Sequence, residues 1–124
     1  MRKHEITDEL IRLSKLAKEL GFPQVVESGQ WVWSNLDQEM YCAQNKIPID
    51  LREAAPEEVL ILSFSRCLEW AKGNDLVVTM DASNDGADFV SIWASGGEVR
   101  GRAKVHHEAI AKAVVKMLEA EQCK

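Results

Sequence analysis

The residues most able to bind a partner lie around Gly96-Gly97, between two stretches that are typical of β-strands. If the two glycines form a two-residue loop, Trp93 lies opposite Arg100, and alternation places their neighbours two residues away on the same sheet face. The candidate interaction face then consists of Phe89, Trp93, Arg100, Arg102 and Lys104. Aromatic rings can stack on bases beside cations that hold phosphates, and Trp and Arg are also frequent anchors of protein interfaces.

Three interpretations of this face remain open. Phe89 and Trp93 can pack under a helix or loop, with Arg100 stacked on Trp93, which would make the cluster structural. An exposed cluster favours a protein partner over nucleic acid, because 15 Lys and Arg stand against 20 Asp and Glu and the formal charge is −5. A one-residue slip in register would move all of these side chains to the other face.

An acidic segment, DASNDGAD at 81–88, partly matches a calcium-binding loop in the spacing of its oxygen-bearing side chains. The twelfth position of that loop requires a bidentate Glu, and Ile92 stands there instead. The segment also lies between expected strands, whereas such loops join helices. We therefore expect a hairpin turn, in which Asn, Asp and Gly tolerate positive φ.

The histidines and cysteines are not spaced for metal or nucleophilic chemistry. His106 and His107 are adjacent, so we expect them to point in different directions and to form a polar helix start. The cysteines are Cys42, Cys67 and Cys123, an odd number with no C-x-x-C pair, and the second is expected in the core. We identify no catalytic, cofactor-binding or metal-ligating residue. A deep pocket lined by titratable groups would revive an enzymatic function.

Hydrophobic spacing predicts the elements of the first half of the chain. A helix capped by Thr7 runs to Gly21, which stops it. Short strands at 25–26 and 31–33 follow, joined as a hairpin by a Ser-Gly turn. Residues 35–55 show no clear pattern and predict a long connection packed on the body of the protein.

The second half predicts two helices around three strands. Pro56 is a good first residue for a helix that reaches Gly73, although residues 59–64 would also fit a buried strand. Three strands and a helix with an apolar stripe follow, at 76–81, 88–94, 99–105 and 107–119. The order α-β-β-α-β-β-β-α predicts a single α+β domain over residues 1–124, in which an antiparallel sheet packs with three helices as a layered sandwich.

The composition is typical of a soluble globular protein. Hydrophobic residues make up 46% and charged residues 28% of the 124 residues, both close to average. The odd cysteine count fits a reducing compartment, and no apolar stretch is long enough for a signal peptide or a membrane span. We therefore expect a cytoplasmic protein with no cofactor and no membrane association.

Several segments together resemble a family of small phage and prophage proteins. The segment LAKELGFPQ at 16–24 is similar to that family's K-x-L-G-F-P-Q motif, and Trp31, Trp33 and Tyr41 fit the aromatic strands that follow it. An Ala-Pro pair before a helix, at longer spacing than usual, and EAIAKA at 108–113 are similar to its later segments. The resemblance implies a bacterial mobile-element origin, with no known activity and no functional residues.

These observations predict a non-enzymatic phage or prophage accessory protein in the bacterial cytoplasm. It is expected to bind a host or phage protein or to form a homo-oligomer. The alternative is a module that binds single-stranded nucleic acid with the aromatic and basic sheet face, in a salt-sensitive manner. The discriminating observation is whether Trp93 and Arg100 are covered in the folded chain.

Overall fold

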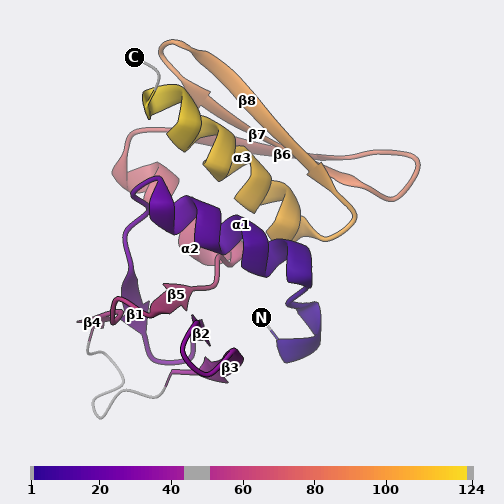
Figure 1. The fold of residues 1–124 in the computed structure, drawn as a ribbon. Helices are drawn as coiled ribbons and strands as arrows, with labels where there is room; N and C mark the ends of the chain where they lie inside the picture. The colour runs from indigo at the N-terminus through magenta and orange to yellow at the C-terminus, as the bar shows by residue number, and fades with distance from the viewer. Residues whose placement is uncertain (1, 44–50, 123–124) are drawn as a thin grey trace. The chain divides into compact units, whose positions relative to one another are not determined.

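The computed structural model describes residues 2–43 and 51–122 (Figure 1). The chain falls into two units, residues 1–61 and 62–124. Each unit combines α-helix with antiparallel sheet, so the α+β class predicted from the sequence is confirmed. The single-domain organisation stays a prediction.

The first unit contains one α-helix, α1 (Asp8–Glu19), within its described residues, and both ends of this helix are capped. The Thr7 hydroxyl accepts a hydrogen bond from the backbone N–H of Leu10 at 3.1 Å. At the other end Gly21 has a φ of 99°, and the N–H of Phe22 donates to a carbonyl of the last turn at 2.9 Å. This closure satisfies carbonyls that the helix leaves unpaired. The predicted start and stop of the first helix are therefore confirmed.

The rest of the described part of unit 1 consists of a 3-10 turn and five short strands: η1 (Lys3–Glu5), β1 (Val25–Glu27), β2 (Trp31–Ser34), β3 (Glu39–Cys42), β4 (Leu51–Glu53) and β5 (Glu58–Leu60). The strands form two antiparallel sheets, β1-β4 and β3-β2-β5. The predicted hairpin between β1 and β2 is therefore wrong. The N–H of Gly29 donates to the Ala43 carbonyl at 2.7 Å, so the turn leads the chain from one sheet into the other.

The second helix, α2 (Phe64–Gly73), begins later than predicted and ends where predicted. Ser63 caps it, because its hydroxyl accepts from the N–H of Arg66 at 3.1 Å. The residues expected in its first turns include β5, which pairs with β2 through Val32 and Leu60. A short apolar run is compatible with a helix or a strand. Here it forms a strand, because β2 is available to pair with it.

Unit 2 joins α2 to a three-stranded antiparallel sheet and a long C-terminal helix. The elements are β6 (Val77–Ala82), β7 (Asp88–Ala94), β8 (Gly97–Ala103) and α3 (His106–Gln122), with the strands in the order β6-β7-β8. The α3 helix packs along β7 and β8 (Figure 1), and α2 contacts α3 and β6. The predicted apolar stripe of α3 is buried: Ile110, Ala113, Val114, Met117 and Leu118.

Gly101 in β8 lets α3 lie directly against the sheet. A Cβ atom at this position would stand 2.0 Å from the carbonyl oxygen of Ala109 and 2.7 Å from the backbone nitrogen of Ala113. On the same side of the sheet, Val90 and Ile92 of β7 are fully buried. The helix therefore covers one face of the sheet at backbone contact distance.

The β7–β8 turn lies one residue earlier than predicted. Ala94 pairs with Gly97, which has a φ of 141°, so the turn residues are 95 and 96. Trp93 consequently lies opposite Glu98, and the predicted cross-strand pair of Trp93 with Arg100 is wrong. Because the pairing shifts by two residues, each side chain keeps its predicted face.

Candidate interaction surface

The sheet face turned away from α3 carries the candidate residues together with side chains of β6. We call this set the outer face: Val77, Thr79, Asp81, Phe89, Ser91, Trp93, Glu98, Arg100 and Arg102. Its two exposed apolar side chains are Val77 and Trp93, which are 59% and 44% exposed and lie opposite each other on β6 and β7. The interpretation that Trp93 packs under another element is therefore wrong.

Hydrogen bonding orients the exposed indole ring of Trp93. Its Nε1–H donates to the Thr79 hydroxyl oxygen on β6 at 3.3 Å. The ring is thereby tied to the strand that also carries Val77. An amphipathic ring with one polar end fixed and its apolar surface open is well suited to an interface.

Both outer-face arginines already have carboxylate partners within the chain. The Nε–H of Arg100 donates to Glu98 Oε1 at 2.9 Å. Arg102 forms an ion pair with Asp85, and its guanidinium carbon lies 5.3 Å from the centre of the half-buried Phe89 ring. Sequence reasoning treated this face as basic and missed both carboxylates. Alternation alone could have found Glu98, whereas Asp85 reaches the face from the β6–β7 turn.

The acidic segment between β6 and β7 forms the predicted hairpin turn. Gly86 has a φ of 83°, and the Asp85 carboxylate accepts hydrogen bonds from the Ser83 hydroxyl and, at 3.2 Å, from the N–H of Ala87. The Ser83 hydrogen bond lowers the pKa of Asp85 most, followed by the Ala87 N–H, and the charge of Arg102 lowers it further. No group of three or more potential ligand side chains that could hold a metal ion occurs among the residues that the structure describes.

Lys104, the fifth candidate, is exposed but follows the last residue of β8. It therefore lies beyond the paired strand. The structure brings Phe89, Trp93, Arg100 and Arg102 together on one face, and adds Val77 and Thr79 from β6. Only the pairing of β6 with β7 reveals that these last two residues belong to the same surface.

His107 and Cys67 are buried in unit 2, and His106 lies beside His107. The ring centres of His106 and His107 are 4.0 Å apart, so the expectation that the two side chains point apart is wrong. His107 is buried, and its Nδ1 accepts a hydrogen bond from the N–H of Phe64 at 2.9 Å, which joins the first turns of α2 and α3. Cys67 is fully buried as predicted, and burial raises the pKa of its thiol. A thiol in this state is a poor nucleophile.

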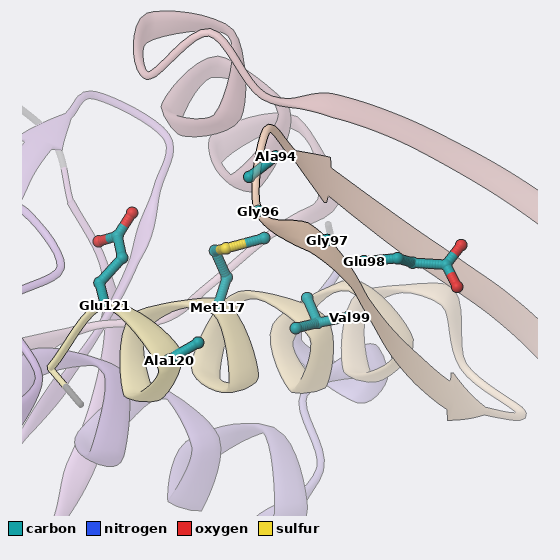
Figure 2. A pocket seen from close by; sticks show the side chains of 8 residues that line it. All are labelled: Ala94, Gly96, Gly97, Glu98, Val99, Met117, Ala120 and Glu121. Carbon is teal, nitrogen blue, oxygen red and sulfur yellow. The ribbon is translucent and has the colours of Figure 1, made fainter. Parts of the chain in front are cut away.

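A hollow of about 160 Å³ lies between the β7–β8 turn and the last turns of α3 (Figure 2). Met117 projects from α3 toward the turn, and Val99 and Ala120 add apolar surface. The residues that line it include Glu98 and Glu121 but no Ser, Cys or His. Ligand pockets usually measure about 300–1,000 Å³. By its volume, this hollow therefore falls short of the deep pocket that would indicate an enzyme.

The fold and the outer face define an α+β protein with an exposed sheet surface of aromatic, aliphatic and ion-paired side chains. Comparison with protein-family models, with curated proteins and with solved structures finds no match for this chain. The resemblance to phage and prophage proteins therefore stays a prediction. Within the described ranges, no helix is both long and apolar enough to cross a membrane.

Proposed function

We propose that this chain is a non-enzymatic accessory protein that binds another protein through the outer face. Following the resemblance in the sequence, we propose that the partner is a phage protein or a protein of a bacterial host. The observation that carries this proposal is the exposed pair of Trp93 and Val77, beside arginines that Glu98 and Asp85 neutralise. Protein interfaces are enriched in Trp and Arg and are depleted of unpaired charge at their centres.

A single-stranded nucleic acid is the second candidate, because Trp93 and Phe89 could stack on bases. Phosphate binding, however, draws on cations that are available to it. Arg100 and Arg102 each contact a carboxylate of the same chain, and the net charge is −5. To bind phosphates, both arginines would have to leave their carboxylates on a protein of net negative charge. The two ion pairs therefore favour a protein partner over nucleic acid.

The test is capture of partners from the bacterial host by the immobilised full chain, with surface variants run in parallel. We expect Trp93→Ala to reduce capture of the specific partner by about thirtyfold, the effect of losing an interface hot spot of about 2 kcal/mol. The matched control is Leu36→Ala, because Leu36 is also apolar and is 78% exposed, but belongs to unit 1. Equal capture by the Trp93→Ala variant and the wild type would contradict the proposal.

A second measurement separates the two candidate functions. The wild-type chain is titrated into labelled single-stranded DNA and RNA at low salt, and the protein proposal predicts no binding. Binding that weakens steeply with salt and is lost in Arg100→Ala would instead support the nucleic-acid alternative.

A further inference from the structure

The two edges of the β6-β7-β8 sheet are protected to different degrees. At the β8 edge, Nζ of Lys116 donates to the backbone carbonyl of Arg100 at 2.6 Å, and Nζ of Lys112 donates to that of Arg102 at 3.0 Å. Lysine is one of the residues by which sheet proteins keep an edge from pairing with another strand. Side chains of α3 therefore occupy two backbone acceptors of β8.

The β6 edge has no such protection in the part of the chain that the structure describes. β6 pairs only with β7, and five of its six residues are exposed. Its sequence, VVTMDA, contains no lysine and no proline. An exposed edge strand of this composition is a template for pairing with a further strand.

The backbone alternation identifies which groups of β6 are available. The carbonyl of Arg100 points away from β7, since it accepts from Lys116. In an antiparallel ladder the groups that face the neighbouring strand alternate along each strand. Arg100 pairs with Ser91, and Ser91 pairs with Thr79, so the alternation can be carried from β8 to β6. The backbone groups of Thr79 therefore point toward β7, and those of the residues on either side of it point toward the open edge.

We infer that β6 pairs antiparallel with β6 of a second copy of this chain, about a two-fold axis at Met80. Met80 is 45% exposed although it lies on the sheet face that α3 packs against. Pairing would bring the two Met80 side chains together and would join their outward backbone groups as a hydrogen-bonded pair. The inference does not depend on the partner proposed above.

Of the registers centred on Thr79, Met80 or Asp81, the position of the charged side chain favours the one centred on Met80. Asp81 is the one charged residue of β6. With Met80 at the axis, Asp81 lies opposite Thr79 of the other copy, whose hydroxyl can donate to the carboxylate. With Asp81 at the axis, two like charges would lie directly opposite each other, which is destabilising. With Thr79 at the axis, the carboxylate would lie against Val77.

The difference between the two sheet edges also limits the association to two copies. Within the β6-β7-β8 sheet, each copy has one open edge, β6, while Lys112 and Lys116 occupy acceptors at the other edge. Two copies related by a two-fold axis then use up both open edges, which gives a dimer and not a fibre. The two outer faces would form one surface, with both copies of Trp93 on the same side.

A disulfide cross-link tests this geometry directly. In a Cys42→Ser/Cys123→Ser background, Met80→Cys places two thiols at the axis, where Cα atoms about 5.5 Å apart suit a disulfide. Val77→Cys is the matched control, because Val77 is also exposed on β6 but would lie about 20 Å from its counterpart. Under mild oxidation we expect Met80→Cys to form a covalent dimer at least tenfold faster than Val77→Cys. Equal rates would overturn the inference.

Light scattering after gel filtration tests the association without cysteines. The wild-type chain should show twice its 13.9 kDa mass, and Met80→Lys should raise the dimer dissociation constant at least tenfold while the circular dichroism spectrum stays unchanged. A monomeric wild type at millimolar concentration, or an unaffected dimer in Met80→Lys, would refute the pairing. Loss of the dimer with capture of the partner retained would leave the proposed function standing, so the two can fail separately.

Discussion

Replacing Gly101 with alanine tests whether α3 rests directly on the backbone of β8. The added Cβ would stand 2.0 Å from the Ala109 carbonyl oxygen and 2.7 Å from the Ala113 nitrogen. Ordinary contacts between heavy atoms lie at about 3.5 Å or more. Neither atom can rotate away, because both belong to the helix backbone. The helix must therefore move from the sheet by roughly 1–1.5 Å near this position.

The expected cost follows from the packing that this movement opens. A gap of about 0.5–1 Å forfeits a quarter to a half of the dispersion energy between the facing atoms. Val90, Ile110 and Val114 are fully buried in unit 2, and burial of each such side chain is worth about 1.5–3 kcal/mol. We therefore expect Gly101→Ala to lower the free energy of unfolding by about 2–3 kcal/mol, within the range seen for overpacked cores.

Urea denaturation followed by circular dichroism measures this loss. The matched control is Gly96→Ala in the same hairpin, since a Cβ at Gly96 meets no atom within 4 Å. We expect the control to change the free energy of unfolding by less than about 0.5 kcal/mol. Equal unfolding midpoints for the two variants would show that α3 does not lie against Gly101, and would refute the packing argument.

Three further outcomes are expected. In the native protein a thiol reagent should modify the exposed Cys42 quickly and Cys67 only after unfolding, because burial raises the pKa of Cys67; equal rates would contradict its burial. An NMR titration should give Asp85 a pKa below the ordinary Asp value, so that its stabilising contribution is present at neutral pH and is lost as the pH falls through that lowered pKa; Asp85→Asn should abolish this dependence. The double variant Lys112→Ala/Lys116→Ala frees the β8 edge and should form assemblies larger than a dimer in light scattering, whereas an unchanged mass would argue against edge protection.

Local signals in the sequence were sufficient wherever a few neighbouring residues decide the structure. Thr7 and Gly21 mark the ends of α1, and the apolar stripe of α3 marks its buried side, as predicted. The turn around Gly86 was likewise predictable, because positive φ favours glycine. These features depend on interactions within one or two turns of chain.

Features that depend on distant partners were not predictable in the same way. The run at Glu58–Leu60 forms a strand because β2 offers it a ladder, although its composition also fits a helix. The strand at Val25–Glu27 pairs with β4 and not with β2, which a Ser-Gly turn alone does not reveal. Pairing between segments far apart in the sequence decided both cases.

The outer face has features of both kinds, some set by local alternation and some by distant contacts. Side-chain alternation is enough to place Phe89, Trp93, Arg100 and Arg102 on one face, because the alternation has period two and a shift of two residues preserves the face. That α3 covers the opposite face and leaves Trp93 exposed follows from contacts between segments that are distant in the sequence. The three-dimensional fold also brings Glu98 of β8 to Arg100 and Asp85 of the β6–β7 turn to Arg102. Coverage and charge pairing depend on which distant segments meet in space, and a periodic pattern along one strand does not contain that information.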